Sequence, residues 1–218
     1  MMESGAAERK ILLIGGGGHC HSVADAVLSL YTQVGIVEGD AVQQDQAGEM
    51  GLPVVGRDCD LPRLFAEGWN EAFITVGSVG DTALRRRLFK KVTSLGYYVP
   101  AIIDPTAVIA RDVEVRDGTF IGKRAVLNSG SRVGRCAIIN TGAIIEHDCV
   151  IGDFVHISPG AVLCGEVVVG EDTHIGAGSA VRQQSKIGRG VIVGMGSVVV
   201  KNIPDNVRAW GSPCRVVD

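Results

Sequence analysis

The stretch TFIGKRAVLNSGSRVGRCAIINTGAIIEHDCVIGDFVHI, residues 119–157, places a large aliphatic residue at every sixth position. The same spacing runs from Ile103 to Val199, and every position of that series is Ile, Leu or Val. A mostly small residue stands two positions before each of them, and glycine often follows. Ordinary alternating strands would not keep a period of six over about 100 residues without insertions. The period therefore predicts a solenoid of short strands.

Three sides of six residues make one triangular coil of 18 residues, and coils of this kind stack about 4.8 Å apart. We expect the aliphatic residue to point inward and the small residue to fill the corner. Glycine, or an asparagine such as Asn128 or Asn140, is expected to adopt the dihedral angles of the turn. The repeat predicts an all-β parallel helix over residues 101–218 and leaves its hand open.

The first hundred residues instead alternate strand patterns with helix patterns. This alternation predicts a small parallel α/β sheet of Rossmann-like type. We expect the domain boundary near Pro100, which divides the chain into residues 1–100 and 101–218. The expected strands cover 10–14, 34–37, 53–55 and 72–76, and the expected helices cover 22–30, 61–67 and 81–94, the last capped by Asp81.

Composition excludes several classes of protein. The 218 residues carry a formal net charge of −3, so the basic excess of a nucleic-acid-binding protein is missing. The six cysteines form no CxxC pair, which favours reduced thiols in a cytoplasmic protein. Residues 1–9 lack the apolar stretch of a signal peptide, and no run of about 18 apolar residues would span a bilayer. We therefore expect a cytoplasmic protein without a membrane span.

Four consecutive glycines, residues 15–18, follow the first expected strand and precede a helix. Helix N-terminal amides converge at such a loop and suit a phosphate group, although the glycines also fit a plain tight turn. The GxGxxG spacing of dinucleotide-binding loops is incomplete, and GxxxxGK[ST] is absent, which argues against NAD and against a P-loop. Glu38 lies 20 residues beyond Gly18 at the end of the second strand, where a carboxylate often meets a sugar hydroxyl.

The histidines of the repeat half are the candidate chemical groups. His156 and His174 lie 18 residues apart and each precedes an inward residue, so they should stack on one outer face. His147 stands near a corner between Glu146 and Asp148, and these carboxylates would raise its basicity and hold one tautomer. The zinc site of γ-class carbonic anhydrases uses three imidazoles, including a closely spaced pair. Spacings of 9 and 18 do not fit that site, and we expect no metal.

The run from Ile139 to Ala161, INTGAIIEHDCVIGDFVHISPGA, closely resembles hexapeptide-repeat sugar acyltransferases. The resemblance is to the bacterial UDP-amino-sugar N-acetyltransferases of the bacillosamine pathway and to the sialic acid O-acetyltransferase group. It covers almost the whole chain, including the glycine-rich domain and a terminal Gly211-Ser212-Pro213 segment. It implies a left-handed β-helix, acetyl-CoA as co-substrate, a nucleotide-linked amino sugar as acceptor, and a homotrimer.

The same resemblance assigns roles to single residues. It makes His147 the general base, with Asp148 (where a Glu commonly stands) or Glu146 orienting its ring. The chain departs from the family's pattern in its fourth loop glycine and in Gly39, which follows Glu38 where a second acid can occur. The implied acetyl-CoA contacts are His156, Gly165 and His174, and the implied nucleotide-sugar contacts are Gly17, Gly18, His19, Glu38 and Gly77.

The expected reaction is acetyl transfer from acetyl-CoA to the amine of a nucleotide-linked amino sugar, with a 4-amino-4,6-dideoxy sugar favoured. O-acetylation of a sugar of the sialic acid type and a non-catalytic nucleotide-sugar-binding solenoid remain as alternatives. His147 and His156 are half a coil apart, which places them on different sides of one prism. We therefore expect a site shared between neighbouring subunits of a trimer. The expected interface residues are Val126, Ile138, Ile144, Val162 and Val168.

Overall fold

The computed structural model describes residues 9–39 and 51–217, which form two compact units. The first unit comprises the described residues up to Gly77 together with Arg87–Pro100. The second comprises Ser78–Arg86 and the chain from Ala101 onward. Most of the N-terminal stretch on which the expectation of no signal peptide rests lies outside the described residues. Ser78–Arg86, which the sequence placed in the first domain, belongs with the second unit.

The first unit is built on a four-stranded parallel sheet in the order β3-β2-β1-β4. Aliphatic side chains such as Leu12 and Ile14 in β1 are buried, because helices accompany a parallel sheet. Helix α1 begins at Gly18, earlier than expected, after the extended Gly17. The elements are β1 (Lys10–Ile14), α1 (Gly18–Val27), β2 (Gln33–Glu38), β3 (Val54–Arg57), the 3-10 helix η2 (Asp58–Asp60), α2 (Leu61–Ala66), β4 (Glu71–Ile74) and α3 (Ala83–Ser94).

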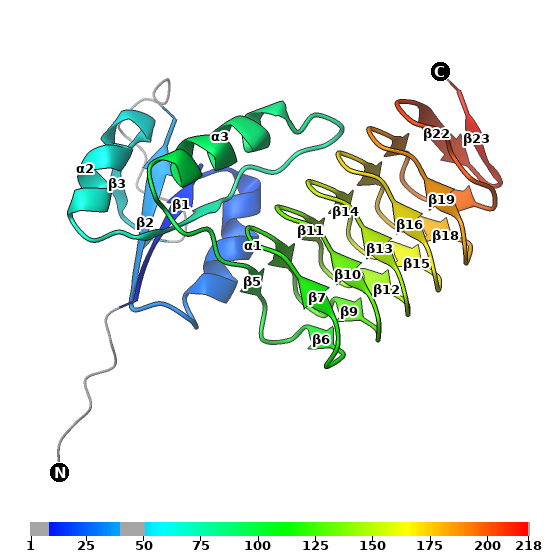
Figure 1. Cartoon of the computed structure of the whole chain (residues 1–218), viewed down its shortest axis with the longest axis horizontal. Coiled ribbons are helices and arrows are strands. Elements are labelled where there is room, and N and C mark those ends of the chain that lie inside the picture. The colour runs from blue at the N-terminus through cyan, green and yellow to red at the C-terminus, as the bar shows by residue number, and fades with distance from the viewer. Residues whose placement is uncertain (1–8, 40–50, 218) are drawn as a thin grey trace, which may run out of the picture. The chain divides into compact units, whose positions relative to one another are not determined.

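The second unit is a stack of three-sided coils (Figure 1). From β5 to β18, each two-residue strand pairs in parallel with the strand 18 residues further along, as Ile138 does with His156. One sheet has eight strands: β5 (Ile102–Ile103), β8 (Phe120–Ile121), β11 (Ile138–Ile139), β14 (His156–Ile157), β17 (His174–Ile175), β20 (Ile192–Val193), β22 (Arg208–Gly211) and β23 (Cys214–Val216). Another has six: β6 (Val108–Ile109), β9 (Val126–Leu127), β12 (Ile144–Ile145), β15 (Val162–Leu163), β18 (Ala180–Val181) and β21 (Val198–Val199). The last has five: β7 (Glu114–Val115), β10 (Arg132–Val133), β13 (Val150–Ile151), β16 (Val168–Val169) and β19 (Lys186–Ile187).

The aliphatic series fills the centre of this prism. From Ile121 to Val199, every sixth side chain is at most 2% exposed, and small residues such as Ala125 and Ser131 are buried beside them. Burial of each large aliphatic side chain contributes about 1.5–3 kcal/mol, so the repeat supplies a continuous core. Ile103 is 36% exposed because it lies in the first coil of the stack. The fold class expected from the sequence, an α/β domain followed by a β-helix, is confirmed.

The turns differ from the expected pattern in one respect. Positive φ values occur at every sixth residue from Gly118 to Gly196, three positions beyond each inward residue, and half of these sites are not glycine. Asn128 and Asn140 are not among them, so the prediction that these two residues adopt the dihedral angles of the turn was wrong. The glycine that directly follows an inward residue serves close packing instead. A Cβ at Gly152 would lie 2.6 Å from the backbone nitrogen of Glu171 in the next coil.

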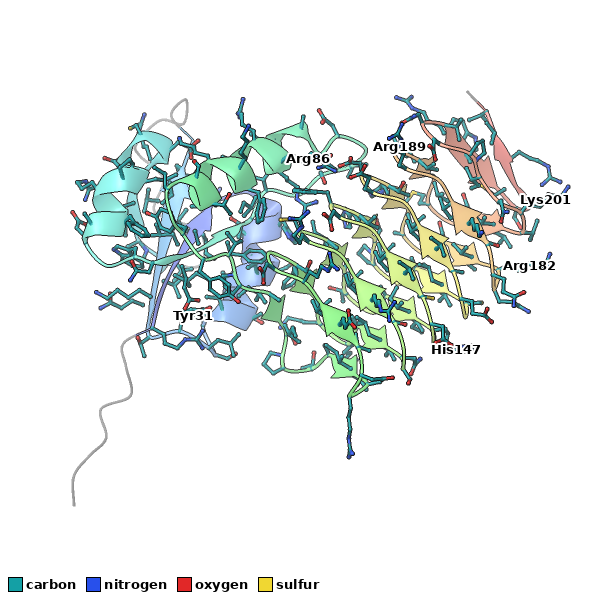
Figure 2. All side chains as sticks on the ribbon, viewed as in Figure 1. Tyr31, Arg86, His147, Arg182, Arg189 and Lys201 are labelled. Carbon is teal, nitrogen blue, oxygen red and sulfur yellow. The ribbon has the colours of Figure 1, made fainter. Side chains whose placement is uncertain are left out.

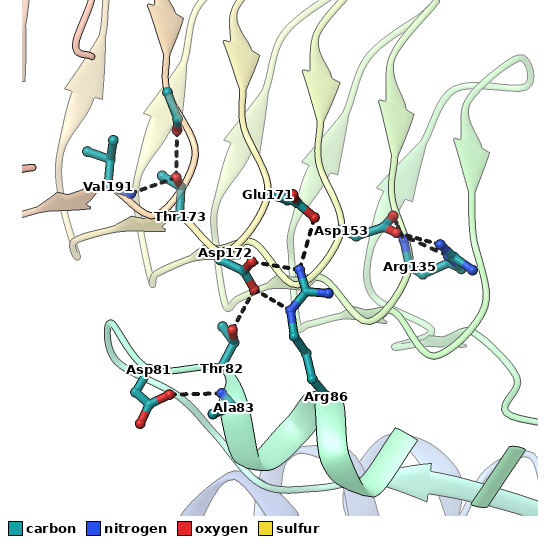
Figure 3. A network of polar contacts seen from close by, with 11 residues as sticks. Asp81, Thr82, Ala83, Arg86, Arg135, Asp153, Glu171, Asp172, Thr173 and Val191 are labelled. Carbon is teal, nitrogen blue, oxygen red and sulfur yellow. Dashed lines mark hydrogen bonds and ion pairs between the residues drawn. The ribbon is translucent and has the colours of Figure 1, made fainter. Parts of the chain in front are cut away.

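The segment Ser78–Arg86 is fastened to the coils by a network of charged groups (Figure 3). The Arg86 guanidinium donates to both carboxylate oxygens of Asp172, at 2.8 and 2.6 Å, and to Glu171 at 3.0 Å. Thr82 donates its hydroxyl to Asp172 at 2.5 Å, and the Arg86 guanidinium lies 4.3 Å from the centre of the Phe154 ring. One carboxylate thus receives bonds from two points of the segment.

We expect Arg86→Gln to lower the free energy of unfolding by about 1–2 kcal/mol, because it removes a bidentate pair and an aromatic contact. Arg135→Gln is the matched control, since Arg135 pairs with Asp153 alone and is more exposed. The Arg135→Gln substitution should lower the free energy of unfolding by about 0.5 kcal/mol or less. Urea denaturation followed by circular dichroism measures both variants. Equal losses would show that the network around Asp172 adds nothing to an ordinary surface ion pair.

Candidate active site

His147 stands at a corner of the prism, between β12 and β13 (Figure 2). Its ring is more than half exposed, and its Nδ1 lies 2.9 Å from Oδ2 of Asp148. The side chains of two adjacent residues rarely face one another. Here they do so where the backbone turns, because Asp148 has a φ of 58°, a conformation that Asp tolerates better than most residues. The carboxylate acceptor sets the tautomer, with the proton on Nδ1 and a lone pair on Nε2.

The surroundings of His147 make it more basic and leave one side of the ring open. The hydrogen bond to Asp148 raises the pKa of His147, and the charges of Glu146 and Glu166 act in the same direction. Gly165, one coil further on, lies against the ring, because a Cβ there would be 2.5 Å from Nε2. The structure thus brings together His147, Asp148 and Gly165, three residues that the sequence assigned to one site.

Asp148→Asn should shift the acidic limb of the kcat/KM profile to lower pH. His147 accepts a proton only when neutral, so activity falls as pH drops through its raised pKa. The amide removes the charge that raises the pKa, while Asn still tolerates the positive φ. We also expect kcat to fall by roughly tenfold because the ring is held less firmly. A pH profile measured from pH 5 to 9 tests this, and an unmoved limb would separate Asp148 from the base.

His156 and His174 stack as the sequence predicts, on adjacent strands of the eight-stranded sheet. They pair in register, and their ring centroids are 4.9 Å apart in an edge-to-face arrangement. They are not solvated, however: His174 is 8% exposed and His156 is half-buried. Burial lowers the pKa of His156 to about 4 and lowers that of His174 as well. Both imidazoles are therefore neutral at physiological pH.

The ring nitrogens of His156 are both engaged. Nδ1 donates to the carbonyl oxygen of Ser78 at 2.8 Å, and Nε2 faces the amide nitrogen of Asn140 at 3.2 Å. Nε2 of His174 lies 3.3 Å from the hydroxyl oxygen of Ser158, within hydrogen-bonding distance. The buried Nδ1 of His174 has no hydrogen-bond partner among the described residues. Neither set of contacts tests whether these histidines bind acetyl-CoA, so that expectation stays a prediction.

The structure does not bring His147 and His156 together within one chain. His147 lies at the corner between the six-stranded and the five-stranded sheets, whereas His156 starts β14 on the eight-stranded sheet. In a three-sided prism, the corner between two sides is opposite the third side. One subunit therefore presents the two histidines on opposite sides of its coils.

The expected nucleotide-sugar residues of the first unit gather at the carboxyl ends of neighbouring parallel strands. The glycine loop follows β1, Glu38 ends β2, and Gly77 lies beyond β4. The Glu38 carboxylate accepts from the Gly16 amide at 3.4 Å. A Cβ at Gly77 would lie 3.4 Å from the Cβ atom of His19, so these two residues are in close contact. Ligands of open α/β sheets bind at this edge, and the exposed Gly17 and Gly18 present the amides at the start of α1.

Three residues with evident roles at these sites were missed by sequence reasoning. The buried Thr75 donates its hydroxyl to the Gly15 carbonyl at 2.5 Å and so fixes the glycine loop. Asn140 and Ser78 bind His156 from positions 16 and 78 residues away in the chain. Only Asn140 left a signal, because the 18-residue coil places it almost one turn before His156.

Within residues 9–39 and 51–217, no group of three or more His, Cys, Asp or Glu side chains is arranged to hold a metal ion. No helix in this part of the chain has the length and apolar character needed to cross a membrane.

Two family models match the sequence. The PglD N-terminal domain matches residues 10–92, and the bacterial transferase hexapeptide (six repeats) matches residues 166–201.

Solved structures are similar over nearly the full length. A His-to-Asn variant of perosamine N-acetyltransferase from Caulobacter crescentus, in complex with CoA and GDP-perosamine, is 36% identical with a TM-score of 0.89. The match covers 96% of this chain and 97% of that one. The acetyltransferase domain of PglB from Neisseria gonorrhoeae, in complex with acetyl coenzyme A, is 35% identical with a TM-score of 0.88, covering 97% and 100% of the two chains. WeeI from Acinetobacter baumannii shares the fold at 24% identity and a TM-score of 0.80, with 95% and 99% covered.

Proposed function

This chain belongs to the hexapeptide-repeat sugar acetyltransferases that carry a PglD N-terminal domain, and we propose that it acetylates the amine of a nucleotide-linked amino sugar. Acetyl-CoA is the acetyl donor. The observation that carries the proposal is His147, oriented by Asp148 and lying against Gly165. The similar proteins crystallised with CoA and GDP-perosamine, or with acetyl coenzyme A, support the same two substrates.

The chemistry at His147 is that of a general base. The sugar amine attacks the thioester carbonyl, and Nε2 of His147 takes the proton that the amine loses as the C–N bond forms. Coil backbone amides would stabilise the negative charge on the carbonyl oxygen. The C–S bond then breaks, and the thiolate of CoA leaves with a proton from the imidazolium. Asp148 holds the Nδ1 proton throughout and stabilises the charged ring.

The first unit would bind the nucleotide end of the acceptor. The diphosphate would accept hydrogen bonds from the Gly17 and Gly18 region, where the amides of α1 converge. Glu38 would accept a sugar hydroxyl, with His19 and Gly77 lining the same edge of the sheet. The glycine-rich loop has no lysine of a P-loop, so the helix N-terminus supplies the electrostatic attraction.

Acetyl-CoA would lie along the corner that begins at His147. Positions 18 residues apart occupy the same corner of successive coils, and this column continues through Gly165 and Gln183 to Lys201. Lys201 and Arg182 are exposed on the same edge as His147 (Figure 2). The phosphates of CoA are anionic, and two cations two to three coils from the base would attract them while the thioester meets His147.

Lys201→Ala should raise the KM for acetyl-CoA several-fold and leave the KM for the nucleotide sugar unchanged. The effect should shrink at high salt, because an exposed charge pair is screened. Lys186→Ala is the control, since Lys186 is an exposed lysine of β19 on the five-stranded sheet. Steady-state kinetics with each substrate varied measures the difference. Equal KM values for the two variants would remove Lys201 from the donor site.

We also propose that the protein is a homotrimer. The six-stranded sheet presents an outward column of aliphatic side chains that spans all its coils, a continuous apolar surface that a second prism would cover. Val168, on the five-stranded sheet, is exposed as expected, whereas Ile138 is 1% exposed and cannot line an interface. The column consists of Val108, Val126, Ile144, Val162, Ala180 and Val198.

The acceptor is tested by release of free CoA thiol from acetyl-CoA in the presence of UDP-, GDP- and dTDP-linked 4-amino sugars. We expect thiol release with at least one of them and none with the corresponding 4-hydroxy sugars. Thiol release only with free sialic acid would favour the O-acetyltransferase alternative. Binding of a nucleotide sugar without any thiol release would favour the non-catalytic solenoid.

A further inference from the structure

The glycine loop after β1 has no side chains of its own to fix its conformation. Glycine allows far more backbone conformations than other residues, so bonds from neighbouring strands have to select one of them. At Gly15 the selected conformation has a φ of +101°, and a Cβ there would lie 2.8 Å from Cγ2 of Val76. The Gly15 amide donates to the Val37 carbonyl at 2.8 Å, which ties the start of the loop to β2.

The peptide group between Gly15 and Gly16 is held from both neighbouring strands of the sheet. β1 lies between β2 and β4, so its carboxyl end is flanked on both sides. On the β4 side, the Thr75 hydroxyl donates to the Gly15 carbonyl oxygen at 2.5 Å. On the β2 side, the Gly16 amide donates to Oε2 of Glu38 at 3.4 Å. The carbonyl and the N–H of a planar trans peptide point in opposite directions, so the hydroxyl that fixes the carbonyl also aims the N–H at Glu38.

Thr75 is built to hold the Gly15 carbonyl firmly. Its side chain is 0% exposed, so water does not compete for the hydroxyl. Its own amide donates to the Ile14 carbonyl at 3.0 Å, which fixes its backbone against β1. A β-branched side chain also has few rotamers available. The hydroxyl is therefore a fixed point from which the direction of the loop peptide is set.

We infer that Thr75 is a positioning residue for the acceptor, acting through the Gly15–Gly16 peptide on the Glu38 carboxylate and on the loop amides that follow. One carboxylate oxygen of Glu38 accepts from the loop, which leaves Oε1 to accept a hydroxyl of the nucleotide sugar. The next residues of the loop begin α1, so the same peptide sets the direction of the amides that meet the diphosphate. The effect on substrate binding rests on the proposed function, whereas the orientation of the loop does not depend on it.

Two substitutions separate the hydroxyl of Thr75 from its shape. Thr75→Val keeps the branched shape and loses the hydroxyl, whereas Thr75→Ser keeps the hydroxyl. We expect Thr75→Val to raise the Kd for a nucleoside diphosphate about fivefold, and Thr75→Ser to stay within about twofold of wild type. Isothermal titration calorimetry with UDP, GDP and dTDP measures this without any turnover. In steady-state kinetics the KM for the nucleotide sugar should rise by the same factor, with kcat and the KM for acetyl-CoA unchanged.

Thr119→Val is the matched control for the loss of a buried hydroxyl. Thr119 is also 0% exposed and also donates to a glycine carbonyl, that of Gly134 at 2.6 Å, but it lies in the coils of the second unit. Both valine variants should melt at a lower temperature than wild type, and only Thr75→Val should bind the nucleoside diphosphate more weakly. An equal loss of nucleotide affinity in both would assign the effect to stability and overturn the inference.

Hydrogen exchange of the amides of residues 15–18 provides a readout that needs no ligand. These amides should exchange faster in Thr75→Val than in Thr75→Ser or wild type. Wild-type nucleotide affinity in Thr75→Val, an equal loss in Thr75→Ser, or exchange that is the same in all three proteins would each overturn the inference. If exchange behaves as expected but the wild-type protein binds none of the three nucleotides, the orientation of the loop by Thr75 stands and the proposed acceptor fails.

Discussion

Substituting His147 by Ala should lower kcat by roughly 10²-fold or more without changing the melting temperature. General-base catalysis contributes about 10²–10⁴-fold when the base is correctly placed, and no second base lies beside Nε2 among its described contacts. Stability should not change, because the side chain is more than half exposed at a corner and fills no part of the core.

His147→Asn is the matched variant for this test. Its amide keeps a donor near the position of Nδ1 and the bond to Asp148, but it cannot take a proton. Rates as low as those of His147→Ala would assign the loss to proton transfer. If either variant turned over at a near-wild-type rate at pH 8, His147 would not be the base. Thermal melts on the same samples establish that both variants are folded.

Mixing two impaired variants should raise activity above that of either variant alone. His147→Ala and His156→Ala subunits, unfolded and refolded together at equal amounts, should regain about a quarter of wild-type activity in random trimers. The reason is that His147 and His156 lie on opposite sides of one prism, so each site draws them from neighbouring subunits.

A control mixture of His147→Ala with Asp148→Ala should be no more active than the average of its two components, because both changes affect the same corner. Light scattering of the wild-type protein should give about three times 22.9 kDa. A fully active monomer, or a mixture of His147→Ala and His156→Ala no more active than its components, would rule out a shared site.

The β-helix was predictable because its determinant is local and repeated. Every coil buries a residue from the same place in the six-residue pattern, so Ile121 or Ile145 can be assigned without knowing any distant contact. The pairing of His147 with Asp148 was predictable for the same reason, since the two are adjacent in the chain. The α/β sheet followed from its alternating elements, with helix α1 starting earlier than its apolar pattern because Gly17 and Gly18 carry no hydrophobic signal.

The surroundings of His156 were not predictable in this way. Its burial depends on Ser78–Arg86, a segment far away in sequence whose docking rests on Arg85, Arg86 and Asp172. Arginine and aspartate on a helix and a turn are usually solvated surface, and nothing local marks these as partners. The same applies to Ile138, which occupies an outward position and is nevertheless buried.

The central claim is tested most directly by the bond that the enzyme makes. The protein is incubated with acetyl-CoA and a nucleotide-linked 4-amino sugar, and the product is isolated with its nucleotide intact. We predict a product heavier by one acetyl group that keeps this group in mild alkali, because an amide survives conditions that cleave an ester. An acetyl group that mild alkali removes would contradict N-acetylation. So would a nucleotide sugar that is still unmodified after prolonged incubation with excess acetyl-CoA.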